Sequence, residues 1–185
     1  NYRWTGQLSS VMLPDPDGSG SLPAPIVSYD YDSLGRQVSE SQNGTLKKSL
    51  AYNTAGRVAS ETLPDPDGTG PLTAATSVYS YDSLGRVIQS TMPGGAVRSV
   101  SYDAVGNVLS VTDPDPDGTG PQIAATTSFA YDALGRTTAV TDALGGVTTF
   151  LWNAAGYQIG TTNALGHSTS VTCDAAGRKT STSNE

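Results

Sequence analysis

The sequence predicts an all-β fold in which tandem β-hairpins form a spiralling antiparallel sheet. Two observations lead to this prediction: a six-residue motif recurs through the chain, and apolar residues alternate with polar ones before each copy. Alternation with a period of two is typical of a half-buried strand, whereas an amphipathic helix repeats every 3.6 residues. We find no amphipathic helix of useful length in the 185 residues.

The recurring motif is most complete at residues 31–36, which read Tyr-Asp-Ser-Leu-Gly-Arg, and it returns at 81–86 and 131–136. Degenerate copies complete the series, so the anchor positions are residues 2, 31, 52, 81, 102, 131, 152 and 173. The spacing alternates between 29 and 21 residues over most of the chain, which gives a period of 50. Fixed periods of this length are characteristic of repeat proteins. We therefore predict a single repeat array over 1–185, with about seven hairpin units, as a fragment of a larger protein or fibre.

Each unit is predicted to be a hairpin, as the third complete copy illustrates. Phe129 and Tyr131 alternate with small residues as in a strand, and the Asp-x-x-Gly that follows has the composition of a turn. The aspartate can close an Asx-turn, and the glycine can adopt a positive φ. Other units turn back at tips such as Asn43-Gly44, a strong hairpin signal. The predicted structural anchors are Tyr31, Gly35, Tyr52, Gly56, Tyr81, Gly85, Tyr102, Gly106, Tyr131, Gly135, Trp152 and Gly156.

The aromatic residues are expected to form the core of this array. An isolated hairpin is marginally stable in water, so the units must support one another. We expect each aromatic pair to be buried against its equivalents in the neighbouring units, as a continuous ladder.

Composition excludes several classes of function. The chain has 17 acidic and 10 basic residues, and this balance gives no electrostatic basis for binding nucleic acid or an anionic membrane. No apolar run is long enough to span a bilayer. The single cysteine, Cys173, is expected to be a small buried hydrophobe, and His167 has no second histidine with which to bind a metal. We do not expect an enzyme, because no pair of nucleophile and base can be assembled.

The motif Tyr-Asp-x-x-Gly-Arg at about 21-residue spacing resembles the YD repeats, also called Rhs repeats, and the resemblance covers the whole chain. Proteins with such repeats include Rhs toxins, the C component of insecticidal toxin complexes, bacterial wall-associated proteins and teneurins. The resemblance implies a spiralling β-sheet shell, which encloses an effector in the toxins and forms part of an adhesion ectodomain in teneurins. The chain departs from the toxin pattern because it lacks the terminal segment whose aspartates drive self-cleavage.

Three insertions lengthen alternate units, and all contain Pro-Asp-Gly-(Ser/Thr)-Gly. The third insertion has Asp at relative positions 1, 3 and 5 and Gly at 6, as in the first half of an EF-hand loop, but position 12 is Ala124. Two interpretations remain open, a plain type I turn and a weak calcium site completed by backbone carbonyls and water. The candidate metal ligands are Asp15, Asp17, Asp65, Asp67, Asp113, Asp115 and Asp117.

Two further sets of side chains carry expectations. The arginines that follow the turn glycines, such as Arg36 and Arg136, are expected to pack over a neighbouring Tyr or to pair with an Asp of the adjacent unit. Trp4 is the aromatic residue expected to be exposed, and it is the candidate for glycan binding.

The predicted function is structural: a YD/Rhs-repeat scaffold of a secreted or cell-surface bacterial protein, located outside the cell. The scaffold could assemble end to end into a fibre and be stiffened by calcium at the acidic loops. Its expected partners are adjacent repeats or further copies of the same protein. The alternatives are a carbohydrate- or cell-surface-binding adhesin segment and a part of a toxin-encapsulating Rhs shell.

Overall fold

The structure is a computed structural model that describes residues 1–3, 5–18, 23–68, 72–118 and 120–185. Within these ranges the regular secondary structure consists of β-strands and no helix. Neighbouring strands pair antiparallel in chain order, which confirms the predicted all-β hairpin fold. The part of the chain covered by these ranges has no helix that could cross a membrane. Trp4, the predicted exposed aromatic residue, lies outside the described residues.

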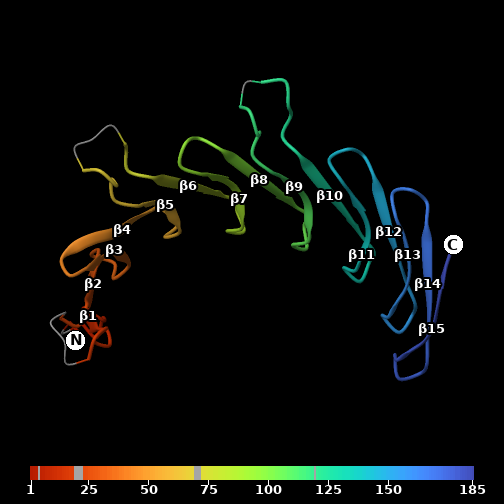
Figure 1. The fold of residues 1–185 in the computed structure, drawn as a ribbon, viewed down its shortest axis with the longest axis horizontal. Helices are drawn as coiled ribbons and strands as arrows, with labels where there is room; N and C mark the ends of the chain where they lie inside the picture. Colours follow the sequence, from red (N-terminus) through yellow and green to blue (C-terminus); the bar gives the residue numbers. More distant parts are fainter. Residues whose placement is uncertain (4, 19–22, 69–71, 119) are drawn as a thin grey trace. The chain divides into compact units, whose positions relative to one another are not determined.

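The first of two units comprises Asn1–Gly95. It begins with an isolated bridge between Tyr2 and Leu8. Its strands pair consecutively and lie side by side, with the connecting turns at alternate edges (Figure 1). They are β1 (Ser10–Met12), β2 (Ile26–Tyr31), β3 (Gln37–Gln42), β4 (Thr45–Tyr52), β5 (Val58–Thr62), β6 (Thr76–Tyr81) and β7 (Val87–Thr91).

The second unit comprises Ala96–Glu185 and repeats the same plan. Its strands also pair antiparallel in chain order. They are β8 (Val97–Tyr102), β9 (Val108–Thr112), β10 (Thr126–Tyr131), β11 (Thr137–Thr141), β12 (Val147–Trp152), β13 (Gln158–Thr162), β14 (Ser168–Cys173) and β15 (Lys179–Asn184).

The motif residues form the turns that the sequence predicts. In the turn between β2 and β3, the Gly35 N–H donates to the Asp32 carbonyl at 3.0 Å, and the Asp32 N–H donates to the Arg36 carbonyl at 2.9 Å. Gly35 has a φ of +80°, so the turn is a type I turn closed by a left-handed glycine. The strand register shifts by one residue between Asp30 and Tyr31, beside this turn. The different Asn43-Gly44 tip has φ angles of +50° and +79°, as a type I′ hairpin requires.

The expected buried core is not present. Among the described residues no side chain is fully buried, and each unit is one layer of sheet. The anchor Tyr81 and Tyr79, two residues earlier in the same strand, are half-buried. Val78 and Ser80, on the opposite face of that strand, are exposed. The alternation therefore identified the more protected face correctly. The prediction of a buried ladder was wrong because period two does not specify whether a second layer covers that face.

Candidate functional site

The contacts that join one hairpin to the next lie where each anchor aromatic meets the preceding motif turn. We call this contact a junction. In each case the anchor side chain donates a hydrogen bond to the backbone carbonyl two residues after the preceding turn glycine. The bonds are Tyr31 Oη to Leu8 O at 2.8 Å, Tyr52 Oη to Gln37 O at 2.6 Å, Tyr81 Oη to Val58 O at 2.7 Å, Tyr131 Oη to Val108 O at 2.9 Å and Trp152 Nε1 to Thr137 O at 2.8 Å. The anchor aromatic residue thus links the end of its own strand to the start of the preceding strand, as Tyr52 of β4 does to Gln37 of β3.

The residue after the turn glycine supplies the second half of a junction. The Arg36 guanidinium carbon lies 4.4 Å from the centroid of the Tyr52 ring. Arg136 lies 5.6 Å from the Trp152 ring and also donates from Nη1 to the Asn153 carbonyl at 3.0 Å. A guanidinium at this distance from an aromatic ring is attracted to its face. The predicted packing of these arginines over a neighbouring aromatic residue agrees with this geometry.

The other expectation for the arginines was wrong, because they pair with the aspartate of their own turn. In the turn of residues 32–36, Asp32 Oδ1 accepts from the backbone N–H groups of Leu34 at 3.0 Å and Arg36 at 2.9 Å. Its Oδ2 accepts from Arg36 Nε at 2.8 Å. The same own-turn ion pair forms at Asp82, Asp132 and Asp174. Arg36 and Arg136 therefore each pair with the aspartate of their own turn and also lie over the anchor ring of the next hairpin.

These contacts favour the ionised form of the turn aspartates. Hydrogen bonds from the Arg36 side chain and then from its backbone lower the pKa of Asp32 below its usual value. The pKa of Asp132 is lowered chiefly by the Arg136 side chain. Burial raises the pKa of Asp103, but hydrogen bonds from the Asn107 side chain and backbone outweigh it, so the net direction is again downward.

Acid is therefore expected to destabilise the fold. Because these aspartates have a lower pKa in the folded chain, their contribution is complete above the unfolded pKa of about 3.9 and is lost as the pH falls through the folded pKa. The melting temperature should be nearly constant from pH 7 to about 5 and then decrease, as followed by circular dichroism. Asp132→Asn keeps the turn acceptor, as Asn53 does in its own turn, and should make the decrease shallower. An unchanged slope in that variant contradicts the assignment.

Lack of space for a Cβ is a second reason, besides the positive φ, why some of the motif turns need glycine. The last residue of one motif turn lies against the glycine of the next turn. A Cβ at Gly85 would overlap the Arg57 guanidinium, and a Cβ at Gly177 would overlap the Tyr157 ring. Gly156, with a φ of +88°, has open space at this position instead.

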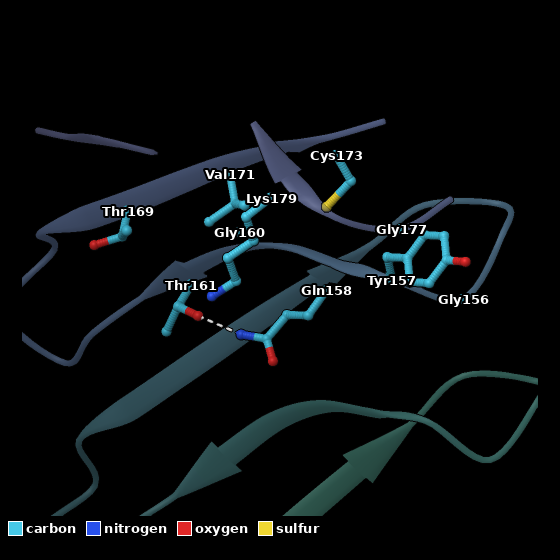
Figure 2. A pocket seen from close by; sticks show the side chains of 10 residues that line it. All are labelled: Gly156, Tyr157, Gln158, Gly160, Thr161, Thr169, Val171, Cys173, Gly177 and Lys179. Carbon is cyan, nitrogen blue, oxygen red and sulfur yellow. Dashed lines mark hydrogen bonds between the residues drawn. The ribbon is translucent and has the colours of Figure 1, made fainter. Parts of the chain in front are cut away.

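The last junction departs from the pattern because Cys173 stands where other units have an aromatic ring. An open groove of about 440 Å³ lies beside it, and Gly160, Thr169 and Val171 also line it (Figure 2). Tyr157, in the place of an arginine, lies beside Gly177. Cys173 is half-buried, which corrects the expectation of a small buried hydrophobe.

The acidic insertions lie between β1 and β2, β5 and β6, and β9 and β10. In each loop the first aspartate of the Asp-Pro-Asp pair accepts a hydrogen bond from the backbone N–H of the second, at 3.1–3.2 Å. Asp67 and Asp117 also accept from the backbone N–H five residues further on. Asp113 forms an ion pair with Arg98 at 3.2 Å. Six of the seven candidate ligands thus form hydrogen-bonded pairs within their own loops, and the seventh, Asp113, pairs with Arg98 instead. Calcium binding stays a prediction.

Sequence reasoning missed the acceptors of the junctions. They are backbone carbonyls of residues as different as Leu8, Gln37 and Val58, so no residue type marks them. The one available signal is their constant position, two residues after each turn glycine.

Comparison with known proteins agrees with this repeat structure. The RHS Repeat family model matches residues 81–119 and 131–167. These two segments match RHS repeats, and the resemblance found in the sequence is confirmed there. No curated protein matches the chain.

Solved structures share the fold at low sequence identity. A crystal structure of TcdB2-TccC3 has a TM-score of 0.54 and 14% identity, over 95% of this chain and 12% of that one. The TcdB2-TccC3-Cdc42 crystal structure and a Tc holotoxin pore of Photorhabdus luminescens each have a TM-score of 0.54 and 16% identity, over 95% of this chain and 11% of theirs. This chain thus spans about a tenth of the length of these relatives.

Proposed function

We propose that this chain is a scaffold segment of a larger secreted or cell-surface protein, in which RHS repeats form a continuous wall of sheet. The observation that carries the proposal is the recurring junction. The same aromatic donor reaches the same carbonyl position between successive hairpins, and guanidinium groups cover the rings in both units. Residues that recur from hairpin to hairpin and hold neighbouring hairpins together have a structural role.

Tyr131→Phe tests whether the hairpins support one another. The substitution removes only the hydroxyl that reaches the Val108 carbonyl, and its expected cost is about 0.5–1.5 kcal/mol. Because the bond joins two hairpins, amide hydrogen exchange should become faster in both β8–β9 and β10–β11. Faster exchange confined to β10–β11 would mean that the hairpins are independent and would reject the scaffold proposal.

A toxin-encapsulating shell is the second candidate. It is supported by the fold shared with TcdB2-TccC3 and with a Tc holotoxin pore. In this case the chain would be one part of a longer sheet that encloses a cargo. Protease treatment of the full-length natural protein distinguishes the two candidates, because a cargo inside a closed shell resists digestion until the shell is denatured, whereas an open wall protects nothing.

Calcium stiffening of the acidic loops is a further proposal. Paired aspartates in three loops support it, and the expected dissociation constant is on the order of 10⁻⁴–10⁻³ M, as in extracellular modules. Titration calorimetry with calcium on the chain should show saturable heat, which Asp115→Asn with Asp117→Asn should reduce. Absence of heat at millimolar calcium rejects the proposal and leaves the hydrogen-bonded turn as the whole role of these aspartates.

The fibre and adhesin roles predicted from the sequence also remain proposals. Assembly with further copies would appear as concentration-dependent growth in sedimentation velocity. Binding of a cell-surface glycan would appear on a glycan array. A chain that stays monomeric and binds no glycan is a scaffold segment without either role.

A further inference from the structure

The hairpin tip between β3 and β4 has a sequence that no other part of the chain repeats. It reads Asn43-Gly44-Thr45, an asparagine followed two residues later by threonine, with a residue other than proline between them. The other six asparagines of the chain have neither serine nor threonine at that position. The triplet Asn-x-(Ser/Thr) is the acceptor sequence for attachment of a sugar to the asparagine side chain.

The fold presents this triplet at the surface. β3 ends at Gln42 and β4 begins at Thr45, so Asn43 and Gly44 alone form the two-residue tip. Their φ angles of +50° and +79° turn the chain sharply at this point. Asn43, Gly44 and Thr45 are all exposed. The tip therefore places the complete acceptor sequence within reach of an enzyme.

Hydrogen bonds to β2 fix the orientation of the Asn43 side chain. The Ile26 N–H donates to Asn43 Oδ1 at 2.8 Å, and the Asn43 N–H donates to the Ile26 carbonyl at 2.8 Å. A backbone N–H can pair only with the oxygen of a side-chain amide, so Nδ2 must lie on the other branch and point away from Ile26. Nδ2 is the atom to which a sugar would be joined.

Asparagines of the other turns have a different role. Asn163 also lies near a hairpin tip, but its Oδ1 accepts from the backbone N–H groups of Leu165 at 2.9 Å and His167 at 3.0 Å. Asn53 caps its own turn in the same manner. These side chains are folded back into the turns that they close, whereas Asn43 is itself at the tip and is held from the neighbouring strand.

We propose that Asn43 is a site of N-linked glycosylation, with a sugar activated at its anomeric carbon as a phosphate ester as the donor. Nδ2 attacks the anomeric carbon, the bond from that carbon to the phosphate oxygen breaks, and the phosphate leaves with the electron pair. One Nδ2 proton passes to a base of the transferase, so a C–N bond replaces an N–H bond. The proposal rests on the proposed secreted or cell-surface role, in which such sugars are common.

The attached sugar would also shield apolar side chains near the tip. Ile26 is 41% exposed and Leu46 is 42% exposed, and both lie within three residues of Asn43 or are hydrogen-bonded to it. A bulky polar group on Asn43 would keep this edge of the sheet soluble. The structural consequence is a sugar-covered hairpin tip on a chain whose other tips lack an acceptor.

Mass spectrometry of the full-length natural protein is the first test. Arg36 and Lys47 flank the site, so trypsin releases residues 37–47 as one peptide. This peptide should be heavier by a sugar, and fragmentation should place the added mass on Asn43. A single hexose would indicate a nucleotide-activated donor, and a longer glycan would indicate a lipid-linked one. A peptide found only in its unmodified form overturns the proposal.

The second test uses the purified chain with UDP-glucose and an N-glycosyltransferase that recognises Asn-x-(Ser/Thr). One hexose should be added, and Thr45→Ser should retain this reaction. Both Asn43→Gln and Thr45→Ala should abolish it, and Thr45→Ala leaves the two tip residues unchanged. Modification that survives Thr45→Ala contradicts the assigned site. Modification by this enzyme without any in the natural protein rejects the proposal but leaves the scaffold role, which Tyr131→Phe tests separately.

Leu165→Thr is the matched control for the geometry, because it creates the same triplet at Asn163. The Asn163 side chain is held inside its turn, so the folded variant should be modified there about ten-fold more slowly than at Asn43. Unfolded synthetic peptides of the two tips should react at similar rates. Equal rates at the two sites in the folded chain would mean that the orientation of the Asn43 amide contributes nothing.

Discussion

Gly85→Ala is expected to destabilise the chain by about 1.5–3 kcal/mol. The left-handed φ of +87° costs an alanine about 1–2 kcal/mol. The new methyl group also displaces the Arg57 guanidinium, which lies 5.8 Å from the Tyr81 ring, and loss of that contact adds about 0.5–1 kcal/mol. Urea denaturation of the purified chain measures the free energy of unfolding.

Gly156→Ala is the matched control for this prediction. Its φ of +88° is nearly the same, but no atom lies where its Cβ would be placed. This variant should therefore show only the backbone cost. In an Arg57→Ala background, Gly85→Ala should cost no more than Gly156→Ala does. Equal costs for the two glycines in the unmodified chain would mean that Arg57 adds nothing to the requirement for glycine.

Cys173→Tyr is expected to stabilise the chain by about 1–2 kcal/mol. A tyrosine here would restore the ring that the other junctions possess, fill part of the groove shown in Figure 2 and bring its hydroxyl toward the Gln158 carbonyl. That carbonyl stands two residues after Gly156, the position that accepts the anchor hydrogen bond at the other junctions. Thermal and urea denaturation should both report the gain.

Cys173→Phe separates the two contributions, because it supplies the ring without the hydroxyl. It should recover the packing part of the gain, and its difference from Cys173→Tyr measures the hydrogen bond. A Cys173→Tyr chain no more stable than the unmodified one would mean that the junction geometry does not extend to this last unit.

The local features of the fold could be predicted from the sequence because neighbouring residues determine them. The Asp32 side chain caps a turn two and four residues ahead, and Gly35 closes it with a positive φ, so the motif itself contains that information. The alternation before Tyr131 similarly identifies a strand and its more protected face.

The contacts between units could not be predicted in the same way. The sequence does not specify which aspartate a motif arginine pairs with, and Arg36 pairs with Asp32 because the tight turn brings residues four apart together. The acceptors of the tyrosine hydroxyls are backbone atoms without a residue signature. Whether a second layer covers the aromatic face depends on surfaces that the pattern of one strand does not describe.

The junctions also set a rule for how such a chain can change in length. Each one uses side chains from two successive motif turns, such as Arg36 with Tyr52, and needs nothing further along the chain. Duplication or loss of a whole 50-residue period therefore preserves the remaining junctions. An insertion of an odd number of residues within a strand instead moves the aromatic ring to the opposite face of the sheet. The array can thus be lengthened or shortened by whole 50-residue modules while the contacts between the remaining hairpins stay the same.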